Sequence, residues 1–187
     1  NELSKANFFI VTVPTPVKKS NIPDLTYVRS SMKNLAKIVK KDDIIILEST
    51  VYPGVTEGVC KKILNQNLRN LKTNNDFFLG YSPERINPGD KLHKLKDITK
   101  IVAFKNNKRI SIIKKVYKEL GKNIVYTSKI KESETAKVVE NIQRDINIAF
   151  INEIFMFCKK SRIDFKEVIN LAKTKWNFMD FNPGLVG

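Results

Sequence analysis

Short apolar runs alternate with stretches of helical periodicity along the first two thirds of the chain. The apolar runs are typical of buried strands, and they lie at residues 7–13, 43–47, 76–81, 98–104 and 124–126. Between them, apolar residues recur every three or four positions, as on the buried face of a helix. This alternation predicts an α/β fold with a parallel sheet, resembling the back half of a Rossmann-type sheet.

The pattern changes after Ser128. Residues 133–160 contain neither proline nor glycine and favour one long helix. Apolar side chains lie on most sides of this helix, so we expect it to be buried among neighbours, including those of a second subunit. A shorter helix and an aromatic tail without regular period follow it. We therefore predict two domains, residues 1–128 with the sheet and residues 129–187 as an all-α central domain that forms a homodimer.

Polar or turn-forming residues follow three of the predicted strands. They are Pro14 and Thr15, then Ser49 and Thr50, then Glu84. Ligands of open parallel sheets bind beyond the carboxyl ends of the strands, so these residues should converge on one crevice. Hydroxyls there can hold a dinucleotide or a water, and a carboxylate can act as a general base. The same hydroxyls also suit the capping of turns and helix starts, and the spacing leaves both interpretations open.

A lysine and an asparagine share one face of the predicted long helix. Lys137 and Asn141 are four residues apart, so their side chains leave the helix on the same side. An ammonium and an amide that point the same way can stabilise a developing oxyanion. The pattern alone favours two solvent-facing residues near a helix start over such a site.

Composition narrows the class of protein only slightly. The formal net charge of +15 invites a nucleic-acid-binding interpretation, but the lysines are scattered, so we expect no nucleic-acid partner. Cys60 and Cys158 are far apart and no cluster has metal-ligand spacing, which predicts no metal site and a cytoplasmic protein. No apolar run approaches the ~20 residues that span a bilayer, so we expect no membrane partner.

Five segments resemble one enzyme family and occur in the family's order. They are VTVPTP (11–16), ESTVYPGVTE (48–57), GYSPERINPGD (80–90), AKVVENIQRDINIAF (136–150) and TKWNFMDFNPGLVG (174–187). Together they resemble the UDP-glucose/GDP-mannose dehydrogenase family, and within it the branch that acts on UDP-N-acetylhexosamines (UDP-GlcNAc or UDP-GalNAc). UDP-glucose 6-dehydrogenases and related Rossmann hydroxyacid dehydrogenases are the alternatives, and the SPERINPGD block is less similar to them.

The resemblance implies an NAD-dependent oxidoreductase for surface polysaccharide precursors. Such an enzyme oxidises the C6 alcohol of the UDP sugar to the uronate in two steps and four electrons, using two NAD. A cysteine traps the intermediate aldehyde as a thiohemiacetal, and a second hydride transfer gives a thioester that water hydrolyses.

Roles for single residues also follow from the resemblance. Lys137 matches the lysine that stabilises the oxyanion, Asn141 the asparagine beside it, Thr50 the threonine that orients a water, and Glu84 the carboxylate of thioester hydrolysis. The residues implied in NAD binding are Pro14, Thr15, Ser49 and Thr50. The residues implied in substrate binding are Arg85, Asn87, Asn177 and Phe181.

Two departures from the family pattern shape what we expect of the chain. Neither the GxGxxG turn nor the GHC segment with the nucleophilic cysteine occurs in it. We therefore expect an internal fragment without the UDP-binding domain, which is inactive by itself. In addition, Pro88 stands where the UDP-glucose branch has a second glutamate, four residues after the first. We expect the substrate loop to be built differently from that branch.

Overall fold

The computed structural model describes residues 2–68, 70–86, 96–106, 109–121 and 123–185. The chain divides into two compact units, Asn1–Val138 and Val139–Gly187, which are described separately. This division falls within a long helix. The predicted domain boundary after residue 128 stays a prediction.

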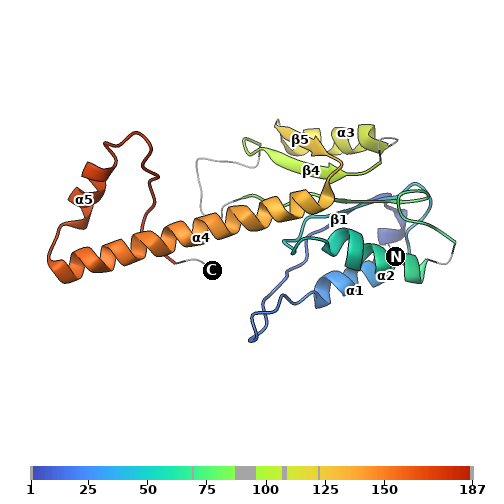
Figure 1. The fold of residues 1–187 in the computed structure, drawn as a ribbon. Coiled ribbons are helices and arrows are strands. Elements are labelled where there is room, and N and C mark those ends of the chain that lie inside the picture. The colour runs from blue at the N-terminus through green and yellow to red at the C-terminus, as the bar shows by residue number, and fades with distance from the viewer. Residues whose placement is uncertain (1, 69, 87–95, 107–108, 122, 186–187) are drawn as a thin grey trace. The chain divides into compact units, whose positions relative to one another are not determined.

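The first unit is built on a five-stranded sheet whose strands lie in chain order (Figure 1). The strands are β1 (Phe8–Val11), β2 (Ile44–Leu47), β3 (Phe78–Tyr81), β4 (Lys100–Phe104) and β5 (Ile124–Thr127). Each of the five apolar runs in the sequence therefore forms a strand. Four of the runs extend beyond the paired residues of their strands.

Most of the sheet is parallel, which confirms the predicted fold class, but one pair of strands is antiparallel. The pairs β1–β2, β2–β3 and β4–β5 are parallel, whereas β4 runs against β3 with Tyr81 opposite Ala103. A parallel connection needs a long crossover, usually a helix. The polar segment after β3, with Asn87-Pro88-Gly89-Asp90, does not favour one. The first residue of β4 therefore lies at the edge where β3 ends.

Gly80 allows β3 to fit between its two neighbours. A Cβ at this position would lie 2.8 Å from Ile46 Cδ1, 2.8 Å from Phe104 Cδ2 and 2.9 Å from the backbone oxygen of Ala103. These separations are shorter than any carbon–carbon or carbon–oxygen van der Waals contact. Glycine at position 80 thus belongs to the packing of β3 against β2 and β4.

Helices cover both faces of the sheet (Figure 1). A short 3-10 turn, η1 (Glu2–Lys5), precedes β1. The elements on one face are α1 (Thr26–Leu35), the π-helical turn η2 (Val55–Cys60) and α2 (Lys61–Asn67), and α3 (Ile110–Leu120) covers the other. Strand β2 serves both layers: Ile45 and Leu47 pack with α1 and α2, and Ile44 and Ile46 pack with α3. The fully buried β2 thus shows the two-residue period of a strand.

A continuous helix, α4 (Ile130–Ser161), spans the residues 133–160 for which one long helix is predicted. It begins in the first unit and continues into the second. In the second unit α5 (Phe165–Ala172) folds back on it, with the rings of Phe155 and Phe165 edge to face at 5.3 Å. The side chain of Asn152 exchanges two hydrogen bonds with the backbone of Gly184, at 2.7 and 2.9 Å. No helix in the described ranges is long and apolar enough to cross a membrane.

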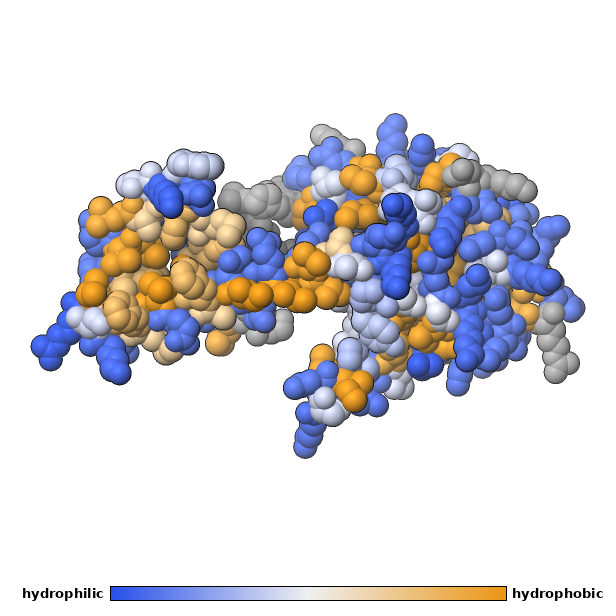
Figure 2. Space-filling model, viewed as in Figure 1, coloured by the Kyte–Doolittle hydropathy of each residue, from blue (hydrophilic) through white to orange (hydrophobic). Residues whose placement is uncertain are grey.

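An apolar stripe of α4 is exposed in the single chain, as expected for a helix whose neighbours include a second subunit. Its members recur at intervals of three, four and seven residues, so they follow one side of the helix. They are Val139, Ile142, Ile146, Phe150 and Phe157. Figure 2 shows hydrophobic surface gathered over the second unit. The partner expected to cover the stripe, a second copy of the chain, stays a prediction.

Candidate active site

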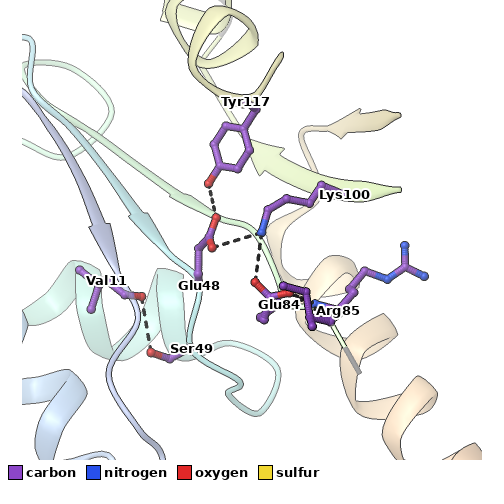
Figure 3. Close-up of polar contacts among 8 residues, drawn as sticks. Val11, Glu48, Ser49, Glu84, Arg85, Lys100 and Tyr117 are labelled. Atoms are coloured by element: carbon purple, nitrogen blue, oxygen red, sulfur yellow. Dashed lines mark hydrogen bonds and ion pairs between the residues drawn. The ribbon is translucent and has the colours of Figure 1, made fainter. Parts of the chain in front are cut away.

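The segments that follow β1 and β2 are tied together at the carboxyl edge of the sheet. The hydroxyl of Thr15 donates to the backbone oxygen of Thr50 at 2.6 Å. The hydroxyl of Ser49 donates to the backbone oxygen of Val13 at 2.6 Å and lies 3.5 Å from that of Val11 (Figure 3). The convergence predicted for these two strand ends is therefore present in the structure.

The hydroxyls of Thr15 and Ser49 stabilise the turns after the strands. Both donate their protons to backbone oxygens, as expected if they cap turns. Ser49 is also buried, whereas Pro14 and Thr50 are exposed at the rim of the edge. That a cofactor contacts Pro14, Thr15, Ser49 and Thr50 stays a prediction. The exposed Pro14 and Thr50 are the more accessible of the four.

Glu84 stands at the same edge, after β3. Because β2 and β3 are adjacent and parallel, the residues after both strands lie side by side. Glu84 Oε1 accepts hydrogen bonds from the backbone N–H groups of Arg85 and Ile86, each at 2.7 Å. The side chain is 44% exposed. Glu84 is thus a carboxylate with one oxygen held by the backbone and its surface open to solvent.

A buried polar cluster adjoins Glu84 (Figure 3). Glu48, the residue directly after β2, accepts a hydrogen bond from the Tyr117 hydroxyl at 2.6 Å and one from Lys100 Nζ at 3.2 Å. All three residues are buried. Burial, and next the charge of Glu48, raise the pKa of Tyr117 above its ordinary value, so the phenol keeps its proton and acts as a donor.

The sequence interpretation missed this cluster. Glu48 follows a predicted strand and has no role in that interpretation, while Lys100 and Tyr117 fall within a predicted strand and a predicted helix. The available signal is a charged residue directly after one apolar run and another inside a second run. Which side chains meet depends on the direction of β4, because a parallel β4 would carry Lys100 to the opposite edge of the sheet.

Lys137 is buried near the start of α4. It is 8% exposed, so the solvent-facing interpretation of this residue is wrong. Three residues earlier, the fully buried Glu134 accepts hydrogen bonds from the backbone N–H groups of Gly54, at 2.5 Å, and Thr56, at 2.8 Å. Gly54 has a φ of 95°, a conformation that favours glycine. Glu134 thereby fastens the turn that follows Thr50 to the helix that carries Lys137.

The remaining predicted site residues are less closely defined. Arg85 is half-buried, and its guanidinium donates to the backbone oxygen of Thr99 at 2.7 Å. Asn141 lies in the second unit, where its side-chain oxygen accepts from Arg144 at 3.0 Å. Asn177 is exposed and Phe181 half-buried in the segment after α5, and all these roles stay predictions.

Two residues of the predicted substrate loop, Asn87 and Pro88, lie outside the described residues. Within the described part of the chain, no group of three or more His, Cys, Asp or Glu side chains is arranged to hold a metal ion.

Comparison with known proteins gives matches along the whole chain. Residues 1–121 match the NAD binding domain of the UDP-glucose/GDP-mannose dehydrogenase family, and residues 131–187 match the central domain of that family. Over 187 residues the chain is 47% identical to a UDP-N-acetyl-D-glucosamine 6-dehydrogenase of Pseudomonas aeruginosa and 43% identical to one of Salmonella typhi. All of the chain is covered in both cases, but only 44% of each relative, so the chain spans less than half the length of these curated relatives.

Solved structures give the same fold. A UDP-D-ManNAc dehydrogenase from Pyrococcus horikoshii is similar with a TM-score of 0.87 at 30% identity, over 98% of this chain and 43% of that one. A GDP-mannose dehydrogenase from Pseudomonas aeruginosa is similar with a TM-score of 0.83 at 19% identity, over 94% of this chain and 41% of that one. The second likeness concerns the fold alone.

Proposed function

Because the chain belongs to the UDP-glucose/GDP-mannose dehydrogenase family, we propose that the full-length protein oxidises the C6 alcohol of a UDP-N-acetylhexosamine to the uronate with NAD. The observation that carries the proposal is the carboxyl edge of the sheet, where Glu84 is held beside the tied segments of Thr15 and Thr50. The relatives named as UDP-N-acetyl-D-glucosamine 6-dehydrogenases support the N-acetyl sugar. Synthesis of surface polysaccharide precursors is the role we infer for such a product.

The edge suits a dinucleotide. In open α/β sheets the cofactor lies across the carboxyl ends of the strands, and here that edge presents the exposed Pro14 and Thr50. When bound, NAD accepts the hydride from the sugar in each oxidation. Pro14 and Thr50 contribute surface to the cofactor site. The accepting oxygens of Thr15 and Ser49 are still available for hydrogen bonds, although both hydroxyl protons are donated to backbone oxygens.

Lys137 and Glu84 have different tasks in the proposed reaction. The buried ammonium of Lys137 stabilises the negative charge that develops on the oxygen bound to C6, with Asn141 as the neighbouring amide. Glu84 accepts a proton from the water that Thr50 orients toward the thioester carbonyl. The carbon–sulfur bond then breaks, the cysteine thiolate takes up the proton held by Glu84, and the uronic acid gives its own proton to solvent.

The two cysteines of the chain are unsuitable as the nucleophile. Both are buried, and burial, followed by the charge of Glu134, raises the pKa of the Cys60 thiol to about 12. A thiol with that pKa is protonated at neutral pH, and the thiolate is the reactive form. We therefore expect the nucleophilic cysteine in the part of the full-length protein outside these 187 residues.

The test is an assay of the purified full-length protein with NAD and each of UDP-GlcNAc, UDP-GalNAc and UDP-glucose. NADH is followed by absorbance and the sugar product by mass spectrometry. We expect an N-acetylhexosamine to have the highest kcat/KM and to give two NADH for each uronate. Preference for UDP-glucose would assign the protein to the UDP-glucose branch, and absence of NADH with every sugar would contradict the proposal.

A further inference from the structure

Lys100 occupies an unusual position for a lysine. It is the first residue of β4 and only 4% exposed, whereas lysine is almost never fully buried unless it is paired. Because β4 runs antiparallel to β3, this end of β4 lies at the carboxyl edge of β3. The antiparallel strand therefore delivers a buried ammonium to the edge that carries Glu84.

Two carboxylates face this ammonium, and they differ in exposure. Glu48 Oε2 lies 3.2 Å from Lys100 Nζ in a buried hydrogen bond. Glu84 Oε2 lies 3.7 Å from it, beyond hydrogen-bonding distance but within an ion pair, and the Glu84 side chain is 44% exposed. Figure 3 shows Lys100 between the two carboxylates. Glu48 is thus suited to hold the ammonium, whereas Glu84 is open to solvent.

Glu48 is fixed from both sides. Its second oxygen accepts the hydrogen bond of Tyr117, and the Lys100 ammonium also lies 5.9 Å from the centre of the Tyr117 ring. With both oxygens bonded and the side chain buried, Glu48 cannot contact a substrate. Glu48, directly after β2, and Tyr117 of α3 together hold the ammonium of Lys100 in place.

Glu84 is held so that its other oxygen meets this ammonium. The backbone N–H groups of Arg85 and Ile86 bind Oε1, which leaves Oε2 toward Lys100. The guanidinium of Arg85 binds the backbone oxygen of Thr99, the residue before Lys100. The segment after β3 and the start of β4 are therefore joined both by the hydrogen bond of the Arg85 side chain and by the ion pair.

We propose that Lys100 is a positioning residue for the hydrolytic step. Its ammonium, held by Glu48 and Tyr117, sets the orientation of the Glu84 carboxylate toward the attacking water. The inference rests on the proposed function, which gives Glu84 its task. Proton transfer needs the base within hydrogen-bonding reach of the water, and a misplacement of about 1 Å can slow a step by about 100-fold. Loss of Lys100 should therefore slow thioester hydrolysis and leave the earlier oxidation largely intact.

The test compares Lys100→Met with Glu48→Gln/Lys100→Met in the full-length protein. The single variant leaves Glu48 buried without its cation, which can impair folding, whereas the double variant removes both charges. In both, we expect the first NADH in rapid-mixing experiments at the wild-type rate and steady-state uronate formation about tenfold or more slower. Mass spectrometry of the stopped reaction should show the acylated enzyme accumulating.

A matched control is Lys105→Met, which removes an ammonium from a half-exposed ion pair with Glu57 just after β4. This variant should hydrolyse the thioester at the wild-type rate. Hydrolysis at the wild-type rate in folded Lys100→Met, or its full recovery in the double variant, would overturn the inference, because Lys100 would then only neutralise Glu48. A wild-type protein that forms no NADH would instead contradict the proposed function, and this inference with it.

Discussion

The ammonium of Lys137 lies on α4, about one helical turn after the carboxylate of Glu134. In the proposed reaction, its burial keeps water away from the charge, which strengthens the interaction with the oxyanion beyond what an exposed lysine would give. The anchored Glu134 fixes the helix at this point. Lys137 is therefore placed before substrate binds, and preorganisation of this kind favours the transition state over the ground state.

Replacement of Lys137 tests this role. In the full-length protein we expect Lys137→Ala to lower kcat by about 100-fold or more, as loss of a preorganised oxyanion partner does. KM should change much less, because the interaction strengthens only as charge develops. Lys131→Ala, an exposed lysine of the same helix, should keep wild-type kinetics. Near-normal turnover of Lys137→Ala with the preferred UDP sugar would show that the assignment is wrong.

The chain pattern predicted some site residues and not others for a physical reason. Thr50 and Glu84 each come three residues after an apolar run, and adjacent parallel strands bring such residues together whatever the remaining fold. The cluster of Glu48, Lys100 and Tyr117 depends on long-range contacts between β2, β4 and α3. Local periodicity carries no information about which strands and helices meet, so this cluster became visible only in three dimensions.

Among the elements, η2 and α4 are joined by one carboxylate. Glu134 accepts from two backbone N–H groups at the start of η2, where N–H groups lack partners within the helix and the local dipole favours an anion. The turn between Thr50 and η2 is therefore set by a residue far along the chain. This contact also places the first turns of α4 within the first unit.

We expect Glu134→Ala to lower the free energy of unfolding by about 1–3 kcal/mol, because it leaves the buried N–H group of Thr56 and the half-buried one of Gly54 without their acceptor. Glu134→Gln should lose less, since the amide oxygen can still accept one bond. Urea titration of the full-length protein measures both changes. The exposed Glu132→Ala on the same turn should stay within about 0.5 kcal/mol of wild type. Equal effects at positions 132 and 134 would contradict the anchoring role.

Strand direction was the feature of the fold least accessible from sequence. An apolar run predicts a buried strand but is the same read from either end, so the orientation of β4 had to be inferred from its connections. The long helix was accessible because 28 residues without proline or glycine leave little alternative, and residues 133–160 fall wholly within α4. Four strands are shorter than their apolar runs, since ladder pairing ends where the neighbouring strand ends.

At the scale of the whole molecule, the exposed stripe of α4 predicts association. Single apolar residues are common on protein surfaces, but several of them along one side of a helix mark an interaction site. We expect light scattering to show a dimer of the full-length protein at micromolar concentration. Ile146→Asp, in the middle of the stripe, should give a monomer, whereas Lys159→Glu on the other side of the helix should not. A monomeric wild-type protein would contradict the dimer.

The 187-residue chain alone is expected to form no NADH with any UDP sugar. It contains no GxGxxG turn, the motif whose helix N-terminus binds the pyrophosphate. Its two cysteines are buried, so no covalent intermediate can form on them. Absorbance measurements with the purified chain, NAD and UDP-GlcNAc or UDP-GalNAc check this expectation. Any NADH above the protein-free control would contradict it.

The location of the active site is tested most directly by a crystal structure of the full-length protein with NAD and the UDP-N-acetylhexosamine it prefers. We expect the nicotinamide ring to lie against Pro14 and Thr50 at the carboxyl edge of β1, β2 and β3, with the sugar C6 within reach of Lys137 and Glu84. A nicotinamide bound at the opposite edge of the sheet, where these strands begin, would contradict it.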